Sequence, residues 1–242
     1  MVLRAVSPFP GAGLPRDGRT AALVARDGSV DWLGLPDLDS PSVFGAQLEA
    51  GRGGRFLLEP AVPHRTERRY LPGTNVLETT FATARGSVRV TDALTLHDDR
   101  ALAPMRELQR RIEGLSGEVP MRWRVEPRFG YGTRTTHLSR RAGVPVAAAG
   151  SDALAVCARD AGEPRIAGDA IGGTFHTAPG GSALIALPFA HQEPFVLPAR
   201  AECDARPEDT CTAWRRRAAE RTPPCRWREP VMRSLPALKL LV

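Results

Sequence analysis

The stretch AALVARDGSVDWL, residues 21–33, contains two short apolar runs on either side of a turn sequence. The runs Ala21–Ala25 and Ser29–Leu33 flank the residues Arg26–Gly28. An Asp-Gly pair favours a tight hairpin because it tolerates positive φ angles. The stretch therefore predicts two antiparallel strands joined by a turn.

The same type of pattern continues to about residue 200. Short runs of alternating or β-branched residues are separated by many of the 23 glycines and 22 prolines. The clearest run is Met121–Glu126, in which Met121, Trp123 and Val125 alternate with charged residues. This alternation predicts a strand with one buried and one solvated face. Further strands are predicted at Arg55–Leu58, Asn75–Phe81, Ser87–Asp92, Met105–Ile112, Ala153–Ala158 and Ala183–Leu187.

After Pro207 the pattern changes to a helical one. Glu208–Arg221 has Cys211, Trp214 and Ala218 at spacings of three and four, with acidic residues first and arginines later. This segment predicts one helix.

A second helical pattern begins near Arg228, with Val231, Leu235 and Leu238 on one face, although Pro236 conflicts with a regular helix. A helix that ends on an apolar face needs a surface to pack against. We therefore expect an all-β domain, a helical linker and the beginning of something else.

Composition and charge narrow the function classes. With 42% hydrophobic and 25% charged residues, the chain has the composition of an ordinary globular protein. The sequence pI is about 9.9, but residues 206–242 hold nine basic and four acidic residues, so most of the net charge of +6 belongs to this tail. No nucleic-acid reader motif accompanies the charge, and no run of membrane or signal-peptide length is found. We expect a cytoplasmic protein that binds neither nucleic acid nor membrane.

The sequence shows no autonomous catalytic or metal site. The cysteines Cys157, Cys203, Cys211 and Cys225 form no CxxC pair and have no matching histidine spacing, which favours buried thiols over zinc ligands or disulfides. The five histidines also lack metal-ligand spacing, and common hydrolase and phosphate-binding signatures are missing. We predict no catalytic residue, no metal and no cofactor.

Four residues remain as candidates for ligand contact. Trp32 stands beside Asp31 after the predicted hairpin, and Asp37 and Asp39 follow two positions apart. An aromatic face with carboxylates that accept hydroxyl protons suits the rim of a sugar pocket. A polar turn after Pro36 explains the two later carboxylates equally well.

Five blocks of sequence, in order, resemble those of bacterial glycoside hydrolase family 15 proteins, the glucoamylase-like and trehalase-like enzymes. The blocks cover nearly the whole chain and are DGRTAALVARDGSVDWLGLPDLDSPSVFGAQLE (17–49), RRYLPGTNVLETTF (68–81), GSVRVTDAL (86–94), RRIEGLSGEVPMRWRVEPRFGYG (110–132) and WREPVMRSLPALKLL (227–241).

This resemblance implies a fold and a division of labour. It implies a mainly β fold, a large antiparallel β-sandwich (residues 1–205), a helical linker (206–226) and the truncated first helix of an (α/α)6 barrel (227–242). In that family an inverting pair of glutamates in the barrel hydrolyses the α-glucosidic bond. The chain is therefore expected to be inactive alone and to pack against the barrel in cis or in trans. The alternative is a stand-alone module that binds an oligosaccharide or another protein.

Overall fold

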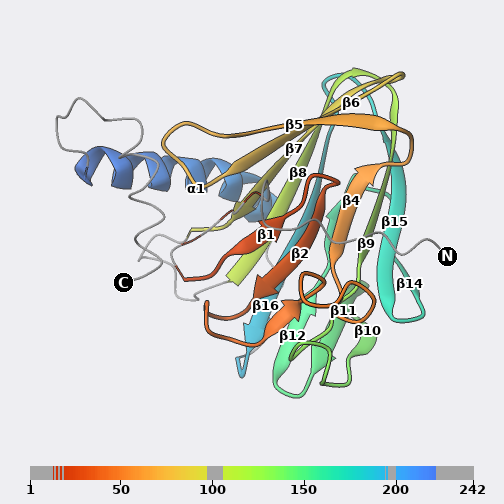
Figure 1. The fold of residues 1–242 in the computed structure, drawn as a ribbon, viewed down its shortest axis with the longest axis vertical. Helices are drawn as coiled ribbons and strands as arrows, with labels where there is room; N and C mark the ends of the chain where they lie inside the picture. The colour runs from red at the N-terminus through yellow and green to blue at the C-terminus, as the bar shows by residue number, and fades with distance from the viewer. Residues whose placement is uncertain are drawn as a thin grey trace.

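The computed structural model describes residues 13, 15, 17, 19–96, 106–193, 195 and 200–221. Within these residues, sixteen strands form two antiparallel sheets, and one helix follows them (Figure 1). The prediction of a mainly β, antiparallel fold is confirmed.

The first sheet has seven strands in the order β1-β2-β4-β9-β15-β14, and β3 pairs with β2. Their bounds are β1 (Ala22–Val24), β2 (Ser29–Gly34), β3 (Ser42–Phe44), β4 (Phe56–Pro60), β9 (Val119–Val125), β14 (Arg165–Ala167) and β15 (Ala170–Thr177).

The second sheet has nine strands in the order β10-β11-β12-β16-β8-β7-β6-β5, and β13 pairs with β16. Their bounds are β5 (His64–Tyr70), β6 (Leu77–Thr83), β7 (Gly86–Leu94), β8 (Arg106–Gly117), β10 (His137–Arg141), β11 (Val144–Ala149), β12 (Asp152–Ala155), β13 (Cys157–Arg159) and β16 (Ser182–His191).

The apolar core lies between the two sheets and draws residues from both. On β9, the side chains of Met121, Trp123 and Val125 are buried in this core, while Arg122 and Arg124 are exposed on the outer face. The alternation read from the sequence is therefore the alternation of the folded strand.

The predicted hairpin is present as β1 and β2, with one irregularity. Leu23 pairs with Trp32 and Val24 with Val30, so Asp31 is an extra residue in β2, a β-bulge. The turn requires glycine at position 28. Gly28 has φ +85, and a Cβ there would lie 2.2 Å from the carbonyl oxygen of Leu58.

A buried ion pair crosses the interior. The guanidinium of Arg110 (β8) donates from Nε to Asp92 Oδ1 (β7) at 2.7 Å, and the two side chains are 1% and 0% exposed. Its Nη1 also donates to the carbonyl oxygens of Gly28 at 2.8 Å and Phe56 at 3.3 Å. Arg110 therefore links the nine-stranded sheet to the β1–β2 turn and to β4.

Helix α1 (Arg200–Arg221) begins earlier than the predicted start at Glu208 and contains Pro207 in its interior. A proline cannot donate to the carbonyl four residues before it, which here is that of Cys203. The side-chain amide of Gln109 (β8) donates to that carbonyl instead, at 3.3 Å. The nine-stranded sheet thus replaces the hydrogen bond that the proline removes.

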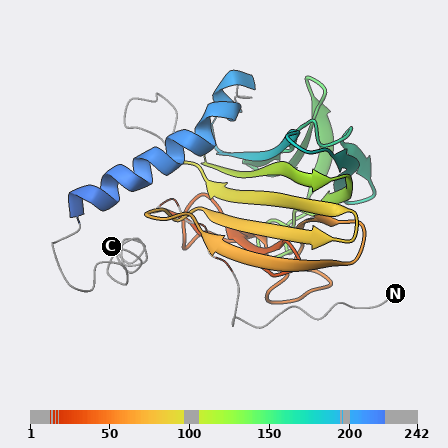
Figure 2. The same ribbon diagram turned by 90° about the horizontal axis from the view of Figure 1, so that it is seen from above.

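Two further contacts fix α1 against the same sheet. Arg206 donates from Nη1 to the buried Glu107 carboxylate at 2.8 Å. Cys211 and Trp214 pack with Val76 and Ala93 in a small apolar cluster. Figure 2 shows α1 crossing one end of this sheet, with its C-terminal turns extending beyond the strands.

Several sequence predictions lie outside the described residues: the second helix from Arg228, Cys225 and the segment 227–242. The domain boundaries stay predictions. None of the described helical residues forms a segment long and apolar enough to cross a membrane. In the described part of the chain, Cys157, Cys203 and Cys211 are free thiols, and no cluster of residues there could hold a metal ion.

Candidate functional site

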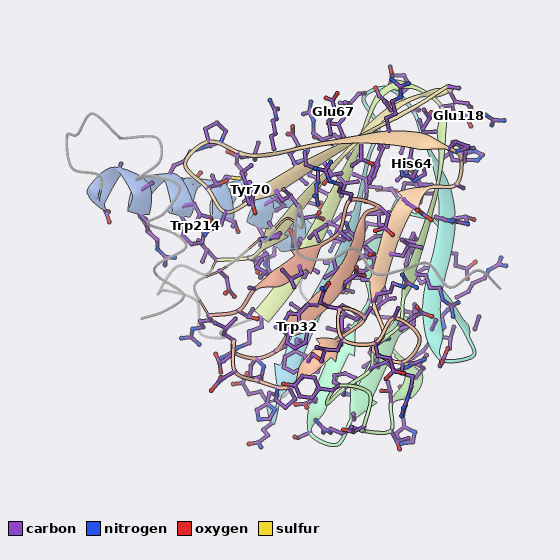
Figure 3. The ribbon with its side chains drawn as sticks, viewed as in Figure 1. Trp32, His64, Glu67, Tyr70, Glu118 and Trp214 are labelled. Carbon is purple, nitrogen blue, oxygen red and sulfur yellow. The ribbon has the colours of Figure 1, made fainter. Side chains whose placement is uncertain are left out.

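Trp32 lies half-buried on β2, directly after the bulge at Asp31. Its ring lies 5.9 Å from that of Tyr131, measured between centroids, with a tilt of 42°. Figure 3 shows Trp32 in the lower half of the view, away from His64 and Glu118 at the upper right and from Trp214 on α1. The two rings, together with the loop 35–41 that follows β2, are called the Trp32 surface below.

Tyr131 belongs to the connection between β9 and β10 and has an unusual backbone. Gly130, Tyr131 and Gly132 have φ values of 61°, 61° and 78° in succession. A bulky residue rarely adopts this conformation, and it persists only where surrounding contacts hold it. Tyr131 is 46% exposed, so the backbone presents this ring to solvent beside Trp32.

The contacts that hold this loop come from both ends. The backbone N–H of Arg128 donates to the carbonyl of Val43 at 2.8 Å, and Phe129 is buried in the core. On the other side of Tyr131, the Arg134 guanidinium binds the carboxylate of Asp152 and the carbonyl of Ala149. The ring position is therefore set by two sheets.

Asp31 does not reach solvent as a rim residue would. It is 4% exposed, and Ser29 donates its hydroxyl to Asp31 Oδ1 at 2.5 Å. Burial raises the pKa of this carboxyl, and the Ser29 hydrogen bond opposes the increase. The side chain is therefore part of the interior, at the bulge that directly precedes Trp32.

Asp37 and Asp39 lie in loop 35–41, which folds back over Gly34. A Cβ at Gly34 would lie 3.1 Å from the carbonyl oxygen of Ser40 and 3.5 Å from that of Asp37. Asp37 is half-exposed and lies 3.6 Å from the Arg106 guanidinium, whereas Asp39 is exposed. The loop therefore brings two carboxylates to the end of β2, two residues beyond Trp32.

The structure thus places Trp32 on β2, against Tyr131; it places Asp37 and Asp39 in the loop that directly follows β2, and Asp31 in the interior. It adds Tyr131, which sequence reasoning did not select. The signal was present, because a tyrosine between two glycines in RFGYG (128–132) indicates an unusual turn. The two aromatic rings can contact a polyhydroxylated ligand; that Asp37 and Asp39 join them at a sugar rim stays a prediction.

Comparison with known proteins identifies the domain. The profile of the family described as "Trehalase-like, N-terminal" matches residues 11–174. The trehalase of Mycolicibacterium smegmatis is 39% identical over 143 residues, which covers 52% of this chain and 21% of that protein. The trehalase of Mycobacterium tuberculosis is 39% identical over 130 residues, covering 48% of this chain and 19% of that protein.

An archaeal relative matches at lower identity. Trehalase 1 of Sulfolobus acidocaldarius is 32% identical over 121 residues, covering 50% of this chain and 19% of its own length. The chain spans about a fifth of the length of the curated relatives it matches. Since the family profile covers well over half of the residues, the chain belongs to the family of trehalase-like N-terminal domains.

Proposed function

We propose that this chain is the non-catalytic N-terminal domain of a glycoside hydrolase of family 15, of trehalase or glucoamylase type. The observation that carries the proposal is the family match over residues 11–174, together with relatives named trehalase that extend far beyond it. The domain supports a separate (α/α)6 barrel, supplied in cis or in trans, and the two catalytic glutamates belong to that barrel.

Ion pairs within the described part of the chain are consistent with a structural role. Buried acidic side chains form ion pairs within the fold: Asp92 pairs with Arg110, Glu107 with Arg206 and Glu59 with Arg122.

The free thiols of Cys157, Cys203 and Cys211 suit a reducing compartment, and we place the protein in the cytoplasm on this ground.

The purified 242-residue chain is expected to release no glucose from trehalose, maltose or isomaltose. Hydrolysis with inversion needs a carboxylic acid and a carboxylate on opposite faces of the sugar, and this proposal assigns both to the barrel. The measurement is a coupled glucose assay, with a full-length trehalase as the positive control. Steady glucose release that co-purifies with the chain would refute the proposal.

The Trp32 surface is proposed to reach the rim of the sugar pocket in the complete enzyme. In a full-length relative with a tryptophan at the Trp32 position, replacement by Ala is expected to raise KM about tenfold, or about 1.4 kcal/mol, with a smaller change in kcat. The physical reason is the loss of an aromatic face that binds the substrate before reaction.

The matched control for this experiment is Ala at the position of Leu115, an exposed apolar residue on β8. That substitution should leave both kinetic constants unchanged. Unchanged KM and kcat for the Trp32-position variant would remove this surface from the sugar pocket, without affecting the assignment of the domain.

A further inference from the structure

A groove of about 620 Å³ lies on the outer face of the seven-stranded sheet, across β4, β9, β15 and β14. Its lining includes three arginines, Arg122, Arg124 and Arg165, and one acid, Glu163. Its size falls in the range of small-molecule sites. Trp32 is not part of its lining, so this groove is separate from the Trp32 surface.

The groove exists because a glycine interrupts a row of outward-facing side chains. Leu57 pairs with Arg124, Arg124 with Gly172, and Gly172 with Arg165, so these four residues follow one another across the sheet. Directly paired residues project from the same face. Gly172 has no side chain, which leaves an open floor between the two guanidinium groups.

The acidic rim of the groove is held in place by the fold. Glu163 lies between two residues whose carbonyls are bound by side chains from other strands. Trp123 donates from Nε1 to the carbonyl of Ala161 at 2.7 Å, and Arg140 donates from Nη2 to the carbonyl of Pro164 at 2.6 Å. A rim fixed before binding lowers the ordering cost that a ligand must overcome.

Some charged side chains of the groove already form ion pairs within the protein, and others do not. Arg122 binds Glu59 at 2.5 Å, and Arg124 binds Glu126 at 2.9 Å. Among the residues that the structure describes, Glu163 and Arg165 make no such ion pair, and both are exposed two positions apart. The lining of the groove therefore includes one open acceptor and one open donor, two positions apart in the chain.

This pairing favours a neutral ligand rich in hydroxyl groups. A hydroxyl both donates and accepts, so neighbouring hydroxyls can donate to the Glu163 carboxylate and accept from the Arg165 guanidinium. Arg122 and Arg124 already form ion pairs with glutamates, so an anion would meet one open guanidinium and also the Glu163 carboxylate. A cation would meet the positive charge of the arginines. We propose that this groove is a carbohydrate-binding site that takes vicinal hydroxyls on Glu163 and Arg165.

The site is independent of the proposed catalytic partnership, since binding can be measured on this chain alone. Isothermal titration of the 242-residue chain with maltotriose is expected to give a Kd of about 1 mM. The double variant Glu163→Gln/Arg165→Gln keeps the net charge and is expected to weaken binding at least tenfold, because charge-assisted hydrogen bonds to the hydroxyls are lost.

The matched control is Arg65→Gln/Glu67→Gln on β5, an exposed pair with the same spacing on the other sheet (Glu67 is labelled in Figure 3). It should bind maltotriose like the unmodified chain. No heat of binding, equal weakening by both double variants, or binding of inorganic sulfate in place of maltotriose would each overturn the proposal. None of these outcomes bears on the glucose-release assay, so the two proposals fail separately.

Discussion

Arg110→Ala is expected to lower the free energy of unfolding by about 3–5 kcal/mol, because it leaves the Asp92 carboxylate buried without its partner. The same substitution removes the donor to the carbonyls of Gly28 and Phe56 and the guanidinium 4.8 Å from the Phe56 ring centroid. Urea unfolding followed by circular dichroism at pH 7 measures the loss.

Two further variants make this test specific. Arg111→Ala, on the next residue of β8, removes an arginine that is 42% exposed and pairs with Glu113, and should change stability by less than about 0.5 kcal/mol. If Arg110→Ala does not fold, Arg110→Lys keeps the charge but loses the fork of donors, and should show an intermediate loss. Equal stability of the Arg110 and Arg111 variants would contradict a structural role for the buried pair.

Arg206→Ala is expected to cost about 3 kcal/mol at pH 7, because it strands the Glu107 carboxylate, which is 0% exposed, beneath α1. Burial raises the pKa of Glu107 above its ordinary value of 4.5, and Arg206 acts in the opposite direction. Without Arg206 the pKa should rise further.

The loss of stability in Arg206→Ala is expected to depend on pH. A carboxyl with a raised pKa binds its proton more tightly in the folded state, so its contribution to stability is complete below pH 4.5 and is lost as the pH rises through the folded pKa. The Arg206→Ala loss should therefore be small at pH 4 and full at pH 7, and Glu107→Gln should remove the difference. Urea unfolding of each variant at both pH values provides the measurement.

The control for Arg206 lies on the same helix. Arg215→Ala removes an exposed arginine 3.7 Å from Glu208 and should change stability by less than about 0.5 kcal/mol at either pH. An Arg206→Ala loss that is the same at pH 4 and pH 7 would show that the buried Glu107 charge is not the cause.

Many of the strands could be predicted from the sequence, because every second residue of a half-buried strand is apolar and faces the core. Met121–Glu126 and the β1–β2 hairpin are the clear cases, and every strand predicted from apolar alternation has a counterpart in the structure. The strands that were missed lack that signal. β5, HRTERRY, is a charged edge strand, and β15 places Gly172 and Gly173 in the middle of a sheet.

The start of α1 could not be predicted because its explanation lies in another element. Pro207 indicated a boundary at that point of the sequence, as an interior proline usually does. The helix passes through it because Gln109, 94 residues earlier, supplies a donor to the Cys203 carbonyl. Likewise, the burial of Arg110 depends on residues far away in the sequence, because its guanidinium donates to the carbonyls of Gly28 and Phe56.

For the candidate site, the sequence could show only which residues are neighbours along the chain, and the role at a sugar rim stays a prediction. Asp37 and Asp39 lie in the loop that directly follows β2, five and seven residues after Trp32. Tyr131 is distant in sequence, but its ring lies against that of Trp32 in the folded protein. Asp31 is buried at a β-bulge, where its carboxylate accepts a hydrogen bond from the Ser29 hydroxyl. Residues that are close in sequence could be recognised from the sequence. The burial of Asp31 at a β-bulge could be recognised only from the structure.

The most direct test of the proposed role is the size and activity of the native protein that carries these residues, captured from its own cells with an antibody against the chain. If the chain is the N-terminal domain of such an enzyme, the captured species is a polypeptide or stable complex larger than 26.1 kDa, and trehalose- or α-glucoside-hydrolysing activity is removed together with it. A free species of 26.1 kDa, with all such activity left behind, would contradict the proposed role.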